Sequence, residues 1–96
     1  MNIYVDIDET ICETPISRNY NESTPIKANI KKINKFYADG HIIIYWTARG
    51  TTTGLDWFGL TKSQLDNWGC KYHKLKMRKP AYDLLICDKT KRIEEL

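Results

Sequence analysis

Apolar and polar positions alternate along this chain in a pattern that predicts strands separated by helices. Four short apolar runs, rich in residue types that favour strands, are bounded by polar or turn residues. They predict strands at Ile3–Val5, Ile42–Trp46, Tyr72–Leu75 and Leu84–Cys87. The second and fourth runs are almost continuously apolar, which is typical of strands covered on both faces in a parallel sheet.

The segments between these runs predict two helices. Lys27–Tyr37 carries apolar residues at helical spacing with lysines between them, and Gly40 lies just beyond its end. The sequence Thr61-Lys62-Ser63-Gln64 has the pattern of a capping box and predicts the start of a second helix that ends near Gly69. A final segment, Thr90–Leu96, is long enough for one or two helical turns.

Strand and helix alternation predicts an α/β domain with a parallel sheet and right-handed crossovers. At 96 residues the chain has room for one domain, spanning 1–96, and one core. Two long polar stretches, Glu9–Thr24 and Ala48–Gly59, follow the first two predicted strands. Ligands of open α/β sheets bind beyond the carboxyl ends of the strands, so these stretches are candidate binding loops.

Composition narrows the class of protein only slightly. The formal net charge of +3 suits an anionic ligand but does not by itself argue for nucleic acid. Cys12, Cys70 and Cys87 are widely spaced and odd in number, so a disulfide framework or a zinc site is not expected. The chain opens directly on a strand and has no apolar run of bilayer length, so we expect a cytoplasmic protein without membrane association.

Polar residues that follow the predicted strands form a candidate site. Asp6 and Asp8 follow the first strand, Thr47 the second and Asp88 the fourth, while Lys79 lies in the loop before the fourth. The aspartate pair alone is equally compatible with a helix cap or turn and with a cation site. Because parallel strands end at one edge of a sheet, Asp6, Asp8, Thr47 and Asp88 are expected to converge there, and Lys79 can reach them from its loop.

Such a set meets the needs of phosphoryl transfer through an aspartate. One carboxylate attacks phosphorus and forms an aspartyl phosphate, which divides one difficult displacement into two easier steps. A magnesium ion and a lysine neutralise charge on the phosphoryl oxygens, and a hydroxyl group binds another of them. A second carboxylate protonates the leaving oxygen and then activates water.

These motifs resemble those of the haloacid dehalogenase superfamily of phosphotransferases. Asp6-Ile7-Asp8-Glu9-Thr10 is similar to its DxDxT motif, and Ile42–Trp46 followed by Thr47 to its second motif. Lys79 and the run Leu84–Asp88 are similar to the third and fourth. The resemblance implies a three-layer Rossmann-like core of the haloacid dehalogenase type, with strand order 4-1-2-3 and no cap domain.

The resemblance also implies a role for each residue. Asp6 is the expected nucleophile and Asp8 the expected general acid/base, with Asp6, Asp8 and Asp88 around Mg²⁺. The expected substrate-binding residues are Thr10, Thr47, Ala48, Arg49 and Lys79. Many relatives carry two acids in the fourth motif, whereas this chain has Cys87 beside Asp88, which predicts a metal site with one carboxylate fewer.

The segment from Thr47 to Asp88 further resembles small capless members of this superfamily that are encoded near capsule or surface-polysaccharide genes.

Arg49 is equally compatible with binding a substrate anion and with bracing a loop. Trp46 is expected in the core. The basic run of Lys71, Lys74, Lys76 and Arg78 is expected to be a solvated strand edge rather than an anion-binding surface.

The predicted function is that of a magnesium-dependent phosphatase acting on a phosphate monoester, with a small molecule such as a sugar phosphate as substrate. Homo-oligomerisation would be one way to shelter a site that lacks a cap. Two alternatives stay open: a catalytically weak or inactive phospho-ligand-binding module of the same fold, and a nucleic-acid 3′-end phosphatase. Nucleic acid is disfavoured because the sequence has no visible pattern of aromatic and basic residues for stacking.

Overall fold

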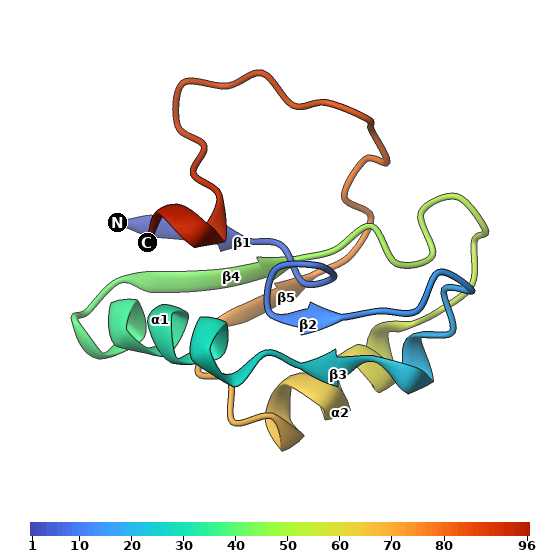
Figure 1. Ribbon diagram of the computed structural model, residues 1–96, viewed down its shortest axis with the longest axis horizontal. Coiled ribbons are helices and arrows are strands. Elements are labelled where there is room, and N and C mark those ends of the chain that lie inside the picture. The colour runs from blue at the N-terminus through green and yellow to red at the C-terminus, as the bar shows by residue number, and fades with distance from the viewer.

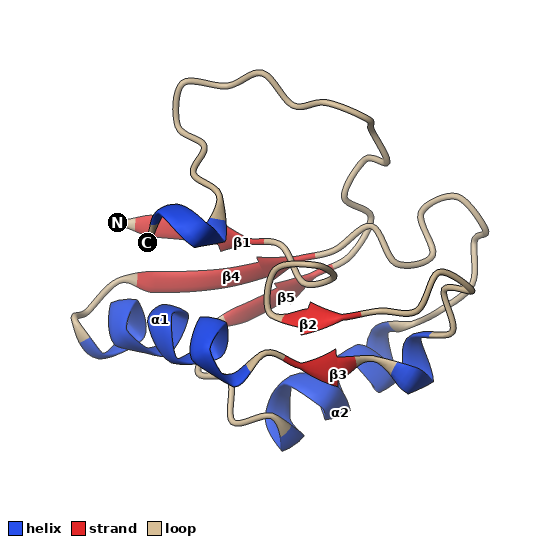
Figure 2. Ribbon diagram, viewed as in Figure 1, coloured by secondary structure: helices blue, strands red, loops and turns tan.

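The computed structural model describes residues 1–96 and contains two longer helices and five short strands (Figures 1 and 2). The strands are β1 Asn2–Val5, β2 Cys12–Glu13, β3 Thr24–Pro25, β4 Ile42–Trp46 and β5 Lys74–Lys76. The helices are α1 Lys27–Ala38 and α2 Phe58–Asn67, with single 3₁₀ turns at Tyr20–Glu22 and Ile93–Glu95. Neither α1 nor α2 has the length and apolar character that a bilayer crossing requires.

The main sheet has three parallel strands in the order β1-β4-β5. Its register places Tyr4 opposite Ile44, and Trp46 opposite Lys76. The segment between β1 and β4 contains the small antiparallel β2–β3 sheet and then α1, whereas α2 connects β4 to β5. All three parallel strands therefore end at the same edge of the sheet.

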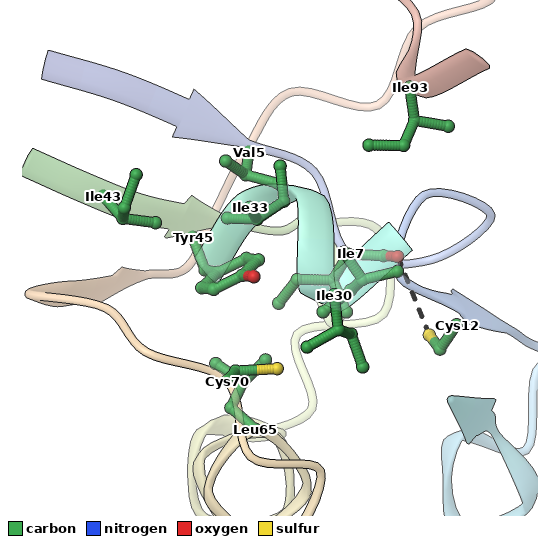
Figure 3. Packing of buried hydrophobic residues seen from close by; sticks show 11 residues of the cluster. Val5, Ile7, Cys12, Ile30, Ile33, Ile43, Tyr45, Leu65, Cys70 and Ile93 are labelled. Atoms are coloured by element: carbon green, nitrogen blue, oxygen red, sulfur yellow. Dashed lines mark hydrogen bonds between the residues drawn. The ribbon is translucent and has the colours of Figure 1, made fainter. Parts of the chain in front are cut away.

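The core lies between one face of this sheet and the two helices (Figure 3). Ile43 and Tyr45 of β4 point into it and are fully buried. Ile30 and Ile33 of α1 and Leu65 of α2 belong to the same buried cluster. Because successive side chains of a strand point to opposite faces, both helices cover the face that carries Ile43 and Tyr45.

The opposite face carries no helix, and we call it the open face. Its residues are those that alternate with the core positions: Tyr4 of β1, Ile44 and Trp46 of β4, and Lys74 and Lys76 of β5. Tyr4 is 52% exposed, while Ile44 at the centre is covered by its neighbours. The expectation that Trp46 lies in the core is wrong, because the alternation of β4 turns it to the open face.

The predicted three-layer core of the haloacid dehalogenase type, with strand order 4-1-2-3, is wrong. Leu84–Cys87 forms no strand but lies in an arch of chain that rises away from β1 (Figure 1). Leu84 is 74% and Ile86 87% exposed, and β1 is an edge strand. A continuous apolar run becomes a buried strand only where both of its faces are covered, and here the open face has no third layer to cover it.

The other predicted elements are present with shifted limits. α1 confirms the first predicted helix, and Gly69 follows α2 with a φ of 75°, as expected of a residue after a helix end. α2 begins at Phe58, one turn before the predicted capping box. Its first N–H groups bond to the side chain of Asp56 and the carbonyl of Trp57, so Thr61 is an interior residue.

Hydrogen exchange tests the assignment of Leu84–Cys87 to exposed chain. We expect the amides of this segment to exchange as fast as those of an unfolded peptide, because none of them bonds within a ladder. Amides of Ile43–Tyr45, which lie in the central strand β4, are the internal control and should be strongly protected. Equal protection of the two segments, measured by mass spectrometry, would contradict the three-stranded sheet.

Candidate functional site

The carboxyl edge of the sheet brings together three of the predicted site residues. Asp6 directly follows β1, Thr47 directly follows β4, and Lys79 lies three residues beyond β5. The Lys79 N–H donates to the Thr47 carbonyl at 3.0 Å, and the Thr51 hydroxyl donates to the Lys79 carbonyl at 2.8 Å. These backbone contacts hold the Lys79 segment against the end of β4.

Asp6 and Lys79 form an ion pair at this edge. Lys79 Nζ lies 3.6 Å from Asp6 Oδ1, and the Ile7 N–H donates to the same oxygen at 2.9 Å. Burial raises the pKa of Asp6 above its ordinary value, although the Lys79 charge and the Ile7 hydrogen bond act in the opposite direction. The Asp6 side chain is 44% exposed, so a ligand can reach it.

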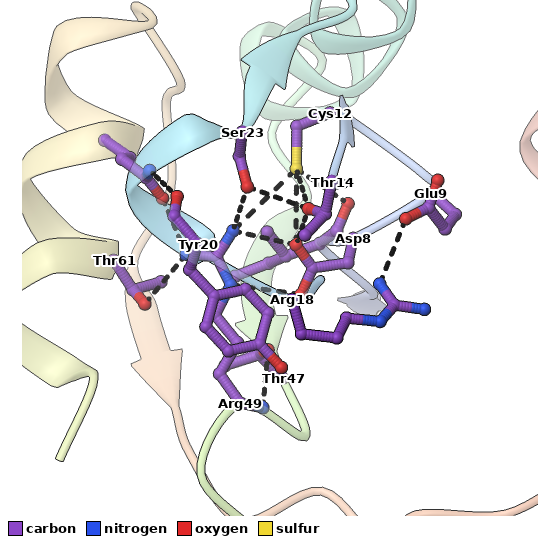
Figure 4. A network of polar contacts seen from close by, with 12 residues as sticks. Asp8, Glu9, Cys12, Thr14, Arg18, Tyr20, Ser23, Thr47, Arg49 and Thr61 are labelled. Carbon is purple, nitrogen blue, oxygen red and sulfur yellow. Dashed lines mark hydrogen bonds and ion pairs between the residues drawn. The ribbon is translucent and has the colours of Figure 1, made fainter. Parts of the chain in front are cut away.

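Asp8 points the other way, into the protein, and pairs with Arg49 (Figure 4). Arg49 Nε donates to Asp8 Oδ2 at 3.0 Å and Nη2 donates to Asp8 Oδ1 at 2.8 Å, a two-pronged arrangement that matches the two planar groups. The Thr14 hydroxyl also donates to Asp8 Oδ1. The Arg49 side chain has no exposed surface.

The remaining N–H groups of Arg49 reach two further segments of the chain. Nη1 donates to Thr61 Oγ1 at 3.1 Å and to Gln64 Oε1 at 2.6 Å, both on α2, and Nη2 lies 3.4 Å from Ser23 Oγ. The guanidinium also lies over the ring of Tyr20, 4.6 Å from its centre. The sequence left two roles open for Arg49, binding a substrate anion and bracing a loop. In this arrangement all of its N–H donors contact the protein, so it braces the loop and no donor remains for a substrate anion.

The electrostatic surroundings of Asp6 and Asp8 shift their pKa values in opposite directions. Burial by itself raises the pKa of Asp8, but the hydrogen bonds from Arg49 and Thr14 and the charge of Arg49 outweigh it, so the pKa is lowered. Asp8 is therefore ionised at neutral pH, the form that accepts a proton. A role as general acid, predicted for the first chemical step, requires the protonated form that Arg49 disfavours.

The other predicted substrate-binding residues lie around the same edge. Thr47 is buried, and its hydroxyl oxygen accepts from the Arg49 N–H at 3.1 Å, which leaves the hydroxyl proton unused. Ala48 is half-buried, and its carbonyl accepts from the Thr51 N–H. Thr10 lies in the turn after β1, where its carbonyl accepts from Asn29 at 2.9 Å.

The predicted magnesium ligands are not gathered. The Asp88 side chain is 85% exposed in the arch, where Cys87 and Lys89 are its contacts, and both oxygens of Asp8 are bound by Arg49. No group of three His, Cys, Asp or Glu side chains in the chain is placed to hold a metal ion. The residues as arranged do not fit the three-carboxylate site predicted from the sequence.

Two hollows are lined by the loop after β4. The larger has a volume of about 630 Å³ and is lined by this loop and by Met77 and Arg78. The smaller, of about 380 Å³, is lined by the same loop with Ser17, Arg18 and Tyr20. Asp6 lines neither of them.

Several residues of the Arg49 network were missed from the sequence. Thr61 and Gln64 are three positions apart and thus lie on one side of α2, but their spacing also has the pattern of a helix start. Ser23 and Tyr20 come from the stretch between β2 and β3, which has no periodic pattern. Only the folded chain shows that all of them surround one guanidinium.

Comparison with known proteins establishes the fold alone. A crystal structure of a structural-genomics target from Vibrio cholerae superposes with a TM-score of 0.89 over 99% of this chain and 86% of that chain, at 22% sequence identity. No protein-family model matches the sequence. No curated protein matches it either.

Removing the buried charge of Asp8 should destabilise the protein far more than removing an exposed charge. Asp8→Asn should lower the free energy of unfolding by about 3–5 kcal/mol, because it leaves a buried guanidinium without its counter-charge. Glu9→Gln, which removes the exposed Glu9–Arg18 pair, is the matched control and should cost less than about 1 kcal/mol. Urea unfolding measures both.

The contribution of Asp8 to the free energy of unfolding should decrease as pH falls. Because the pKa of Asp8 is lower in the folded chain than in the unfolded one, the unfolded chain binds the proton first as pH falls. The stabilisation is complete above the ordinary aspartate range and is lost progressively below it, as pH falls through the lowered folded pKa. The Asp8→Asn variant should lack this part of the acid loss, and an unchanged loss would contradict the assignment.

The loop after β4 predicts unequal effects at two glycines. Gly50 and Gly54 have φ values of 81° and 75°, so alanine at either is strained, by about 1–2 kcal/mol. A Cβ at Gly50 would also overlap the carbonyl oxygen of Leu55, whereas Gly54 faces open space. Gly50→Ala should therefore cost about 1–3 kcal/mol more than Gly54→Ala in thermal or urea unfolding. Equal costs would contradict the close approach.

Proposed function

We propose that this protein is a phosphatase that hydrolyses phosphate monoesters, with Asp6 as the nucleophile. The observation that carries the proposal is the Asp6–Lys79 pair, an accessible carboxylate beside an ammonium group at the carboxyl edge of a parallel sheet. The ammonium group attracts a phosphate dianion to Asp6 and offsets the negative charge that gathers on the phosphoryl oxygens during transfer. The motif resemblance to the haloacid dehalogenase superfamily supports the same assignment.

The proposed reaction has two steps. Asp6 Oδ attacks phosphorus, the bond to the leaving oxygen breaks, and an aspartyl phosphate forms. Water then attacks phosphorus, releases inorganic phosphate and restores the Asp6 carboxylate. The proton that this water loses passes to solvent, because Asp8 points into the protein and Arg49 holds both of its oxygens. The first step is thereby best matched to leaving groups that need little protonation, such as aryl oxides.

A non-catalytic phospho-ligand-binding module is the second candidate. The observation in its favour is that Arg49 occupies both oxygens of Asp8, while Asp88 lies apart in the arch. In such a module Lys79 would hold the phosphate and Asp6 would not attack it. Binding of a phosphate analogue without turnover would favour this candidate.

The nucleophile assignment is tested by comparing the wild type with Asp6→Asn on an aryl phosphate. We expect the substitution to lower kcat by several orders of magnitude, because an amide oxygen does not attack phosphorus. Asp39→Asn, at an exposed ion pair beyond α1, is the matched control and should leave kcat unchanged. Undiminished turnover by Asp6→Asn would contradict the proposal.

The same assay tests how the rate depends on pH and on magnesium. The wild-type rate should fall at acid pH with a midpoint higher than the pKa of an ordinary aspartate, because attack requires ionised Asp6 and burial raises its pKa. The magnesium requirement predicted from the sequence is tested by titrating magnesium after chelation. A rate that is independent of chelation would contradict that requirement while leaving the Asp6 assignment in place.

A further inference from the structure

Aromatic and basic side chains gather on the open face, although they are scattered in the sequence. Tyr4 and Trp46 lie on neighbouring strands with ring centres 5.6 Å apart and rings at 71°. Lys76 extends across the sheet from β5, so that its Nζ is 5.5 Å from the centre of the Tyr4 ring. The register of β1, β4 and β5 thus assembles a surface that sequence spacing does not reveal.

The cluster continues toward the carboxyl edge through Lys79. Its Nζ lies 6.0 Å from the centre of the Trp46 ring and 5.4 Å from that of Tyr82, which is 48% exposed. The same ammonium group pairs with Asp6. Lys76, the paired rings of Tyr4 and Trp46, Lys79 and Tyr82 therefore form one continuous cluster.

The charge on the open face is mainly positive. Lys74 and Lys76 are exposed and form no ion pair with any carboxylate of the chain. Asp6 is the one carboxylate that pairs with a lysine of the cluster. A symmetric second copy of the chain would bring these lysines against one another, so self-association through this face is disfavoured.

We propose that the open face binds single-stranded nucleic acid. Its bases would stack on Tyr4 and Trp46, and its phosphates would pair with Lys74 and Lys76. In the free protein the Lys76 ammonium group lies over the Tyr4 ring, a contact of about 0.5–1 kcal/mol at exposed sites. Base stacking on an aromatic ring contributes about 1–3 kcal/mol, and each phosphate pairing releases counterions, so the exchange favours the bound state.

Unpaired bases are required because a duplex hides their faces within its own stack. Nothing in the contacts of this surface reads the edge of a particular base, so we expect little sequence preference. Binding here does not require hydrolysis at Asp6. Lys79 nevertheless connects the two surfaces, so a strand on the open face would bring a terminal phosphate toward Asp6.

The test is fluorescence anisotropy with a labelled short oligodeoxythymidine that carries no terminal phosphate. Tyr4→Leu keeps most of the apolar area but removes the ring, and it should weaken binding roughly tenfold. Lys76→Gln should lower the slope of log affinity against log salt by about 0.7, the value expected for one phosphate contact on a single strand. Both side chains are exposed, so neither change should impair folding.

Two matched controls lie on α2, on the covered side of the sheet. Lys62→Gln removes an exposed lysine whose Nζ is 5.8 Å from the Tyr72 ring centre, and Phe58→Leu removes a 43% exposed aromatic ring. Neither should change the affinity for the oligonucleotide by more than the error of measurement. Equal losses in the controls and in Tyr4→Leu would overturn the assignment to this face.

Three other outcomes would also overturn the proposal. They are absence of oligonucleotide binding at low salt, equal affinity for a duplex of the same length, and binding to vesicles of anionic lipid without binding to the oligonucleotide. Because the probe has no phosphomonoester, its binding is independent of phosphatase activity. Binding without any hydrolysis of aryl phosphate would leave this proposal standing and remove the proposed function.

Discussion

The buried ion pair between Arg49 and Asp8 is the interaction on which the rest of the fold depends. One guanidinium joins the turn after β1, the loop after β4, helix α2 and the stretch that includes Ser23. The core beside these segments is small, with twelve buried apolar side chains in the whole chain. A charge that is wholly removed from water is costly unless it is fully paired, so moving any one of these segments would leave donors of the guanidinium unpaired.

This pair also explains how two acids only two residues apart acquire different pKa values. Asp8 faces inward, where Arg49 keeps it ionised, whereas Asp6 faces the solvent-accessible edge, where burial raises its pKa in spite of Lys79. The division follows from one turn of backbone at the end of β1. An inward carboxylate supports the loop after β4, and that loop in turn holds Lys79 through Thr47 and Thr51. The Arg49–Asp8 pair therefore supports the loop that holds Lys79 beside Asp6.

The sequence predicted those features that local pattern determines. Apolar runs located β1 and β4, and helical spacing located α1, because these segments pack against one another in the way their patterns require. Leu84–Cys87 has the same kind of pattern, but its outcome depends on a covering layer that the chain does not form. Asp6, Thr47 and Lys79 converge because parallel strands share an edge, whereas Asp88 depended on the missing strand. The partners of Arg49 were not predictable, since a buried guanidinium collects acceptors from segments without any shared periodicity.

The arch beside β1 has a consequence for the behaviour of the protein in concentrated solution. An edge strand with free ladder groups and the apolar side chains of Leu84–Ile86 are exposed in the same molecule. Either feature favours pairing with another chain, and the rate of such pairing rises with the square of the protein concentration. The short length of β1 and the modest positive charge oppose them only weakly. Association through this edge is therefore expected to increase with protein concentration even while the core stays folded.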